Sequence, residues 1–464
     1  MSSMDTSRGP MQPTVKWTQM VAAMAAAGGA FAVGTALAWP SPMGPKLVDN
    51  DDDDRYFPIS KKNFDWVASI LTIGCAVSCL PIGMLMKTFG RKYSMIGMVV
   101  PFLVGWILVA WAQNLAMLLT GRFFLGLAGG AFCVSAPQYA SEIAEKEIRG
   151  IVGVFCVLLI HGGILFVYIL GAYASVFVTS IVCGIVPLVF GLIFFFMPES
   201  PYYLVSSKRD ADVKSTYKWL RGAHYDPSDE IGEIQREIKE NEQNKVSFFE
   251  ILKKKSTIRA LSIGFGLMFF QQASGINVVL FYTTFIFNAA DTGIDPKVQT
   301  IIVGLVLLAA NFAGVFVVDR LGRKILLMFS SIFMTLALVS LGFYFQLNDN
   351  QPAEAENLGW LPLASLCVFL IAYALGSGPL PWVLISEVYS KDYNAIAAPL
   401  NGFFSWMLAF AVTSTFNKIS DAIGIGPTFF IFGGLSLVGV FFTHFVVIET
   451  KGKSMAEIQR DLAA

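Results

Sequence analysis

Three carboxamide side chains stand close together inside one of the apolar stretches of this chain. Gln271, Gln272 and Asn277 fall within seven residues. A carboxamide offers a donor and an acceptor together, which suits a ligand that carries hydroxyl groups. Polar residues in apolar helices also hydrogen-bond to neighbouring helices. We expect this cluster to cover one broad helix face, thinned by Gly275, and to contact a small polar ligand.

Other polar and aromatic residues lie inside apolar stretches of the same kind. An indole stacks on the apolar face of a ring and donates one hydrogen bond, although tryptophans also anchor helices at membrane interfaces. An ionisable residue inside an apolar helix is a functional candidate, although a neutral imidazole bonded to a neighbouring helix explains His161 equally well. The predicted ligand-binding residues are Gln271, Gln272, Asn277, Trp382, Trp406, His161 and Asn311.

A run of glycine and proline interrupts a later apolar stretch. Gly376, Gly378, Pro379 and Pro381 fall within six residues. Such a run breaks helix hydrogen bonding, and broken helices at membrane depth are tolerated where they line a cavity. We interpret the run as a hinge.

Charged residues gather at the ends of the apolar stretches. Opposite charges at such positions suit a latch that opens and closes between two parts of the molecule. The alternative is that they only anchor the helix ends and set the topology. The predicted charge network contains Arg91, Glu142, Arg149, Glu199, Asp319, Arg323, Glu387 and Glu449.

The composition points to lipid as the solvent. Of 464 residues, 55% are hydrophobic and only 14% are charged, and the mean hydropathy is +0.62, whereas soluble domains carry about 25% charged residues. A net charge of zero gives no reason to expect nucleic acid as a partner. Twelve runs are long enough to span a bilayer, near 17–39, 65–86, 94–112, 115–137, 151–171, 175–197, 260–288, 298–318, 325–346, 359–386, 395–416 and 426–448.

No cofactor, metal site or enzymatic centre is expected. All six cysteines lie inside apolar runs rather than at the spacing of zinc ligands. The chain has no Gly-x-x-x-x-Gly-Lys-Ser/Thr phosphate cradle, and no nucleophile–base pair is in view. We therefore expect a protein that is not an enzyme and that needs no cofactor.

Short phrases repeat along the chain in matching order. Phe89-Gly90-Arg91-Lys92 returns as Leu321-Gly322-Arg323-Lys324, and 322 − 90 gives an offset of 232 residues. Ser141-Glu142-Ile143 returns as Ser386-Glu387-Val388 at an offset of 245, and Pro198-Glu199-Ser200 is echoed by Ile448-Glu449-Thr450 at 250. This pattern predicts a parallel duplication of a six-helix unit, with a site between the halves near the membrane midplane.

The fold expected is an all-α membrane protein of twelve transmembrane helices in two six-helix bundles. We divide the chain into a tail 1–16, a bundle 17–204, a linker 205–258, a bundle 259–448 and a tail 449–464. Ile231, Ile234 and Ile238 predict short amphipathic helices in the linker. Lys and Arg favour the links on one side, which places both termini and the linker in the cytoplasm of a cell-membrane protein.

The sequence resembles a known family, the sugar porters of the major facilitator superfamily, which include animal glucose transporters and insect trehalose transporters. The resemblance covers residues 83–457. It rests on six phrases in order: Pro137-x-Tyr139-x-x-Glu142 with Arg149-Gly150; Pro198-Glu199-Ser200-Pro201; Gln271-Gln272-Ala273-Ser274-Gly275-Ile276-Asn277; Asp319-Arg320-Leu321-Gly322-Arg323-Lys324; Gly376-Ser377-Gly378-Pro379-Leu380-Pro381-Trp382; and Glu449-Thr450-Lys451-Gly452. The resemblance implies the major facilitator fold and facilitated transport of a sugar, a hexose or trehalose, by alternating access.

Several positions depart from the family. Where glucose transporters contact the sugar through polar side chains, this chain has Val157, Leu307, Ala374 and Ser405. Losing a partner for a buried polar group costs about 1–3 kcal/mol, so a glucose-tuned site should bind glucose less well here. Asn311 and His161 partly substitute. In the first cytoplasmic link, Lys87 replaces an acid or amide and Thr88 replaces an arginine.

Coupling to protons lacks its usual carrier in this sequence. Proton-coupled relatives have an Asp in span one, where alignment on Gly34 places Ala36, and no Asp or Glu lies between Trp17 and Trp39. This leaves His161 as the titratable candidate and favours uniport. The alternatives are a transporter of a polyol or other small polar solute, a proton-coupled one, and a non-transporting nutrient sensor. The expected partners are a sugar and the lipid bilayer, with a functional monomer and no nucleic acid.

Overall fold

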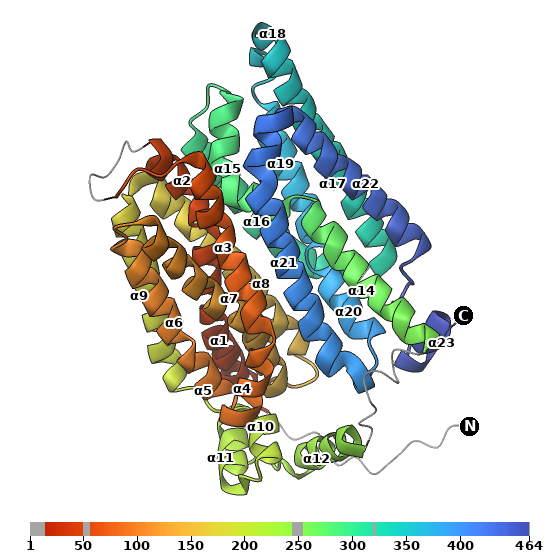
Figure 1. Cartoon of the computed structure of the whole chain (residues 1–464). Coiled ribbons are helices and arrows are strands. Elements are labelled where there is room, and N and C mark those ends of the chain that lie inside the picture. Colours follow the sequence, from red (N-terminus) through yellow and green to blue (C-terminus); the bar gives the residue numbers. More distant parts are fainter. Residues whose placement is uncertain (1–13, 50–55, 244–253, 319–321, 464) are drawn as a thin grey trace.

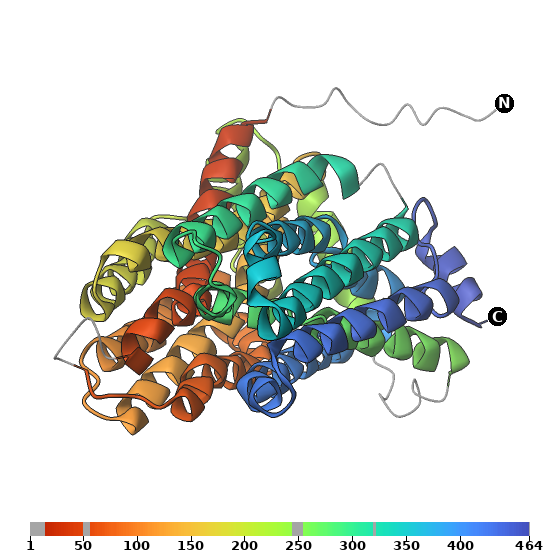
Figure 2. The same cartoon turned by 90° about the horizontal axis from the view of Figure 1, so that it is seen from above.

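The structure is a computed structural model that describes residues 14–49, 56–243, 254–318 and 322–463. Every regular element within these ranges is helical. Figures 1 and 2 show the helices as two bundles side by side, one from each half of the sequence. The three helices that follow the first bundle lie below the two bundles, and we call this end of the molecule the linker end and the opposite end the distal end.

The first bundle uses nine helices for its spans. They are α1 (Lys16–Ala38), α2 (Pro40–Asp49), α3 (Lys61–Cys79), α4 (Pro81–Phe89), α5 (Arg91–Gly97), α6 (Val99–Ala110), α7 (Leu115–Ile143), α8 (Arg149–Tyr173) and α9 (Val176–Phe195). The second bundle contains α14 (Lys255–Ala273), α15 (Ile276–Ala290), α16 (Pro296–Val318), α17 (Arg323–Asn350), α19 (Leu361–Ala372), the π-helical turn η1 (Tyr373–Ser377), α20 (Leu380–Val388), α21 (Lys391–Ile423) and α22 (Ile425–Phe445).

The expected number of spans agrees with these helices. Eleven stretches of the described chain are long and apolar enough to cross a membrane. A twelfth is the pair α3 and α4, which is bent by 50° where Pro81 begins the second helix. Proline lacks the N–H that would continue the ladder, so a bend at this position is expected.

Small residues bring the helices of the first bundle into close contact. A Cβ atom added to Gly126 on α7 would lie 1.9 Å from the carbonyl oxygen of Leu71 on α3, and one added to Gly34 on α1 would lie 2.0 Å from the carbonyl oxygen of Ile160 on α8. Only glycine fits at these two crossings. Close approach of backbones replaces the hydrophobic effect as the source of helix association in a membrane.

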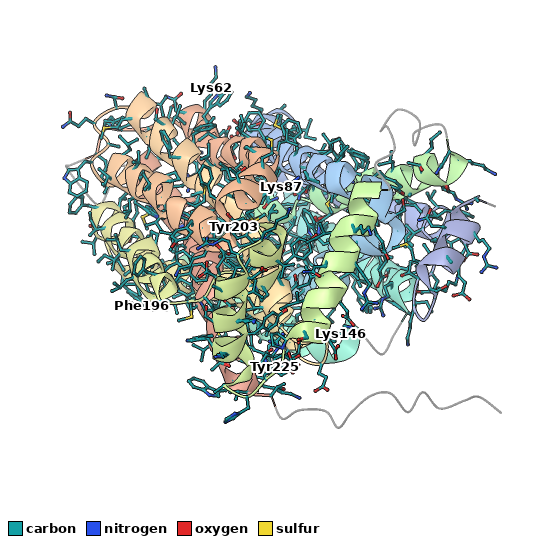
Figure 3. All side chains as sticks on the ribbon, turned by 90° about the horizontal axis from the view of Figure 1, so that it is seen from below. Lys62, Lys87, Lys146, Phe196, Tyr203 and Tyr225 are labelled. Atoms are coloured by element: carbon teal, nitrogen blue, oxygen red, sulfur yellow. The ribbon has the colours of Figure 1, made fainter. Side chains whose placement is uncertain are left out.

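Three short helices follow the first bundle, and the isoleucine spacing predicts the last of them. They are α10 (Pro201–Ser206), which begins before the expected start of the linker at residue 205, α11 (Asp210–Arg221) and α12 (Ser228–Gln243). Ile231, Ile234 and Ile238 of α12 pack against a small core that contains Tyr203 and Tyr217. Arg221 ties the linker to the first bundle, because it donates to the carbonyl oxygen of Ile143 at 2.8 Å. Tyr203, Lys146 and Tyr225 mark this region in Figure 3.

Two further helices complete the second half. One is the short α18 (Pro352–Glu356) at the distal end, and the other is α23 (Met455–Ala463) at the linker end. Ile458 and Leu462 of α23 are buried in the core of the second bundle, and Gln459 donates to the carbonyl oxygen of Val388 at 2.9 Å. The C-terminal segment is therefore packed as part of that bundle.

The largest contacts between the two halves are those of α3 with α21, α8 with α16 and α2 with α15. Polar contacts join them toward the distal end. Ser41 and Thr284 hydroxyls lie 3.1 Å apart, and the Tyr168 hydroxyl donates to the carbonyl oxygen of Leu280 at 2.7 Å. The structure therefore has a closed distal end.

Candidate functional site

The carboxamide cluster lies at a break in the helix rather than on one continuous face. Gly275 adopts φ +80°, a left-handed conformation that favours glycine, and separates α14 from α15. Gln271, Gln272 and Asn277 are all buried. The break sends Gln271 and Gln272 toward different neighbours, so the expected single face is wrong.

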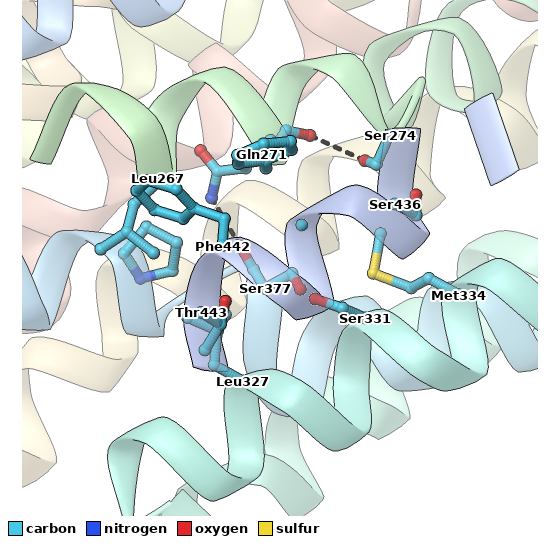
Figure 4. A pocket seen from close by; sticks show the side chains of 13 residues that line it. Leu267, Gln271, Ser274, Leu327, Ser331, Met334, Ser377, Ser436, Phe442 and Thr443 are labelled. Atoms are coloured by element: carbon cyan, nitrogen blue, oxygen red, sulfur yellow. Dashed lines mark hydrogen bonds between the residues drawn. The ribbon is translucent and has the colours of Figure 1, made fainter. Parts of the chain in front are cut away.

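Gln271 binds the interrupted helix of the glycine–proline run. Its side-chain nitrogen donates to the carbonyl oxygens of Ser377 at 2.7 Å and Gly378 at 2.9 Å. In an α-helix the Ser377 carbonyl would accept from residue 381, but Pro381 has no N–H. Gln271 supplies the missing donor, and Figure 4 shows its amide pointing toward Ser377.

Gln272 and Asn277 form a second polar group with α21. The Asn277 amide donates to Gln272 Oε1 at 2.6 Å, and the Gln272 amide donates to Ser405 Oγ at 2.9 Å. The three side chains therefore make a connected chain of donors and acceptors across the helix break. Ser405 stands where the resembled family has an asparagine, and it keeps the acceptor.

The two tryptophans lie in different environments. Trp382 on α20 is 45% exposed, whereas Trp406 on α21 is partly buried and packs against the main core. Trp406 lies one residue after Ser405, so it follows the polar group directly along α21.

His161 and Asn311 both bond to their own helices. His161 Nδ1 lies 2.8 Å from the carbonyl oxygen of Val157, and the Asn311 amide donates to the carbonyl oxygen of Leu307 at 2.9 Å. Each therefore reaches back by one turn to a residue that replaces a family polar contact. Neither is joined to the carboxamide group by a hydrogen bond between described residues.

Two cavities are found among the described residues. One of about 20 Å³ lies in the second bundle and is lined by Gln271, Ser331, Ser377 and Thr443 (Figure 4). A cavity of this size has room for a water molecule and is too small for a sugar. The other, of about 130 Å³, lies between the halves toward the distal end, between Tyr168 and Lys46 on one side and Asn288 on the other.

The predicted charges of the first half form a compact network at the linker end. Arg91 Nη2 lies 2.9 Å from Glu142 Oε1, and Ser200 Oγ hydrogen-bonds to Glu142 Oε2. Glu199 accepts from the backbone N–H groups of Arg91 and Lys92, both at 3.0 Å. Figure 3 shows Lys87 at this end of the bundle, and its side chain is exposed.

The second half repeats this network group by group. Arg323 Nη2 lies 3.4 Å from Glu387 Oε1, and Thr450 Oγ1 donates to Glu387 Oε2 at 2.5 Å. Glu449 accepts from the backbone N–H groups of Arg323 at 3.0 Å and Lys324 at 3.1 Å. The repeated phrases therefore correspond to repeated geometry, with each network contained in its own half.

The two glutamates that accept backbone N–H groups differ in electrostatics. Burial raises the pKa of Glu199 above its ordinary value, although three backbone donors act against it. Burial also acts to raise the pKa of Glu449, but four backbone donors outweigh it and the pKa of Glu449 is lowered. Equivalent positions therefore hold their charge to different degrees.

One described member of the predicted charge set, Arg149, lies apart from these networks. It is the first residue of α8, and its side chain is exposed. Asp319 lies outside the described residues. Thr88, where the family has an arginine, donates to the carbonyl oxygen of Met84 at 2.9 Å in its own helix.

A buried carboxylate that the sequence reasoning missed lies at the distal end. Asp65 on α3 is 2% exposed and accepts from the Tyr282 hydroxyl at 3.0 Å and from the Asn417 amide at 2.5 Å. Asp65 is therefore a buried titratable group in addition to His161. The signal was present, because Asp65 is the only charged residue in the apolar run 65–86.

Comparison with known proteins agrees with this geometry. The family model described as "Sugar (and other) transporter" matches residues 12–462. The facilitated trehalose transporter Tret1 of Polypedilum vanderplanki is 35% identical over 464 residues, which cover 99% of this chain and 91% of that protein. Tret1 of Anopheles gambiae is 34% identical over 460 residues, 99% of this chain and 58% of that protein. The chain spans about half the length of several such relatives, 49% for Drosophila grimshawi.

Solved structures show the same fold. The inward open conformation of the xylose transporter XylE from E. coli has a TM-score of 0.79 at 23% identity and covers 94% of this chain and 98% of that one. The structure of the proton:xylose symporter XylE bound to 6-bromo-6-deoxy-D-glucose has a TM-score of 0.76 at 22% identity, with 96% and 99% covered. The expected all-helical membrane fold is confirmed, and so is the expectation of a transporter family rather than an enzyme family. This multi-pass membrane protein belongs to the sugar porter family of the major facilitator superfamily.

Proposed function

We propose that this protein is a facilitative transporter that carries a sugar, a hexose or trehalose, across a membrane by alternating access. The observation that carries the proposal is the pair of equivalent networks at the linker end. Arg91, Glu142 and Glu199 in one half match Arg323, Glu387 and Glu449 in the other. Two like bundles with like linker ends suit a rocking motion about a site between them.

The closed distal end gives the networks a place in the cycle. With the distal contacts formed, each network stays within its own half. When the distal end opens, the linker ends approach each other, and the exposed Arg149 becomes available to carboxylates of the second half. The networks and Arg149 then act as the predicted latch, which is a bistable contact.

The orientation follows from the basic residues at the linker end. Lys87, Lys92, Lys146 and Arg149 belong to links at this end, and cytoplasmic links carry an excess of Lys and Arg. We place the linker end and both termini in the cytoplasm, and the protein in the cell membrane. The distal end then faces the outside.

The sugar-binding group in this proposal centres on Gln272 and Asn277, and its aromatic member is Trp406, the residue after Ser405 on α21. Their donors and acceptors match hydroxyl groups, and the indole matches the apolar face of a ring. Gln271, Trp382, His161 and Asn311 complete the proposed set, and Gln271 is bound to the helix break in this conformation. Relatives named as trehalose transporters support a disaccharide as well as a hexose.

A polyol or another small polar solute is the second candidate, because specific polar contacts are absent. Val157 is 39% exposed, and Leu307 and Ala374 are buried apolar residues at positions where glucose transporters place polar groups. Such a site has fewer partners with which to select one sugar stereochemistry.

Uptake by oocytes tests the proposal. Labelled glucose and trehalose are each offered alone and in competition with a panel of sugars and polyols. Saturable uptake of glucose or trehalose above that of uninjected cells supports the proposal, and competition by polyols alone favours the second candidate. Absence of saturable uptake for every solute, with the protein detected at the cell surface, contradicts it and favours a non-transporting sensor.

A further inference from the structure

The closed distal end contains a carboxylate that belongs to one half and is held by the other. Asp65 lies on α3 in the first bundle and is 2% exposed. Its hydrogen-bond donors, Tyr282 on α15 and Asn417 on α21, are 217 and 352 residues away in the sequence and belong to the second bundle. Their contact therefore exists only while the two halves are together.

The geometry concentrates both donors on one oxygen. The Tyr282 hydroxyl donates to Oδ1 at 3.0 Å and shares its proton with the carbonyl oxygen of Thr413 at 3.2 Å. The Asn417 amide donates to the same Oδ1 at 2.5 Å. Hydrogen bonds to an ionised acceptor are about twice as strong as those between neutral groups.

Packed aromatic rings exclude water on one side of the contact between Asp65 and Tyr282. The ring of Phe64, the residue before Asp65, meets the ring of Tyr282 edge-on at 6.0 Å and lies 5.3 Å from that of Phe285. Phe64 and Tyr282 are both fully buried. A neighbouring pair, Trp66 and Phe410, crosses from α3 to α21 at 5.7 Å.

The other charges near Asp65 do not replace these donors. Lys418 and Asp421 of α21 act on Asp65 with opposite signs, and both are exposed to solvent. The stability of the buried carboxylate therefore depends on Tyr282 and Asn417.

The buried charge of Asp65 distinguishes its contact from the neutral hydrogen bonds at the distal end, such as the one between Ser41 and Thr284. Burying a carboxylate is costly unless its hydrogen bonds are made, and removing one partner from a buried pair is strongly destabilising. When the halves separate, the carboxylate regains water and its cost disappears. The contact thus has two stable arrangements, closed with both donors in place or open and hydrated.

We propose that Asp65, Tyr282 and Asn417 form a distal lock that holds the outer ends of the two halves together and breaks each time the transporter opens to that side. These are positioning residues that act on the equilibrium between conformations. The inference deepens the proposed transport function and rests on it for its role in the cycle. The lock itself is a property of the protein without any solute.

The distance between the distal ends of α3 and α21 tests the lock. Spin labels on the exposed positions Lys62→Cys and Ala422→Cys are measured by double electron–electron resonance in the purified protein, after subtraction of background labelling without this pair. Asn417→Ala and Tyr282→Phe each leave Asp65 buried with one donor fewer. We expect each variant to raise the population with the longer spin–spin distance, relative to the population with the shorter one, by about tenfold or more.

Two further variants separate the lock from general packing. Tyr344→Phe removes the hydroxyl of an equally buried tyrosine that bonds at 2.8 Å to Ala290 within the second bundle, and it should leave the ratio unchanged. Asp65→Asn keeps an acceptor oxygen and removes the charge, so Asn417→Ala should have a much smaller effect in that background.

The proposal is overturned if Asn417→Ala and Tyr282→Phe both leave the wild-type distances, or if Tyr344→Phe shifts them equally. If one of the two variants fails to fold, the other decides the matter by the same criterion. Because no solute is present, a protein that fails to carry sugar but shows the expected distances contradicts the proposed function alone.

Discussion

At the scale of single residues, Glu199 and Glu449 hold matched positions with opposite pKa shifts. A carboxyl group with a lowered pKa stabilises the folded state above its unfolded pKa, and this stability is lost as the pH falls through the folded pKa. Glu449 follows this rule. Glu199, whose pKa burial raises, holds its charge less favourably in the folded state.

We therefore expect Glu449→Gln to reduce stability more than Glu199→Gln at pH 7. The neutral amide removes a favoured charge in the first case and a disfavoured one in the second. Thermal unfolding in detergent should show a decrease of roughly 2–4 °C for Glu449→Gln, with a smaller decrease for Glu199→Gln. A larger decrease for Glu199→Gln would show that the backbone donors outweigh burial there also.

Asn277 should be needed for solute affinity. Its amide bonds to Gln272 at 2.6 Å, and together they carry the donors and acceptors of the proposed site. Asn277→Ala should raise KM for the transported sugar about tenfold. The matched control is Asn350→Ala at the end of α17, whose amide bonds to Gln346 in its own helix, and its KM should not change.

At the residue scale, the repeated phrases mark charged residues that the structure brings together within each half. Glu142 and Glu387 stand in equivalent phrases, and both meet an arginine of their own half. Asp65 has no repeat partner and sits at the edge of an apolar run, where a charge resembles a helix end. Its importance comes from donors 217 and 352 residues away, and no local pattern contains that information.

At the scale of elements, the junction of α19, η1 and α20 depends on a donor from another helix. Gly378 N bonds to the carbonyl oxygen of Tyr373 at 2.8 Å, which is the spacing of a π-turn. Gln271 donates to the Ser377 carbonyl that Pro381 leaves without a partner. Ser330 Oγ stabilises the same turn, because it accepts a hydrogen bond from Ser377 N at 2.9 Å.

Gln271→Ala should raise KM, because Gln271 belongs to the proposed sugar-binding set, and should also lower the maximal transport rate, because the Ser377 carbonyl loses its donor. Pro381→Ala restores an N–H that can satisfy Ser377 O, so the double variant should be less impaired than Gln271→Ala alone. Uptake kinetics of the four proteins in this cycle provide the test. Additive losses would show that the two residues act independently.

The sequence predicted the helices better than it predicted their breaks. Apolar length gives the spans, and the glycine–proline run marks an interruption that the structure shows at 373–379. The break at Gly275 was not predicted, because one glycine inside a helix is common. It becomes a break here because Gly275 adopts φ +80° with Phe432 within 2.9 Å of the place a Cβ would occupy.

At the scale of the whole molecule, the duplication explains both the architecture and the proposed cycle. The repeated phrases at offsets of 232 to 250 residues fold into the same network twice at one end. The other end is closed by contacts that have no such symmetry, among them the distal lock. Because the contacts at the two ends differ, the distal contacts can break while contacts between the halves form at the linker end. Alternating access requires such an exchange.

The central claim is that this chain moves a sugar down its gradient without a second driving force. Purified protein in liposomes, given labelled glucose or trehalose with and without a pH gradient, tests it most directly. We predict saturable entry that stops when the inner and outer concentrations are equal, whether or not the pH gradient is imposed. Accumulation above the outer concentration that collapses when an ionophore is added would contradict facilitated transport.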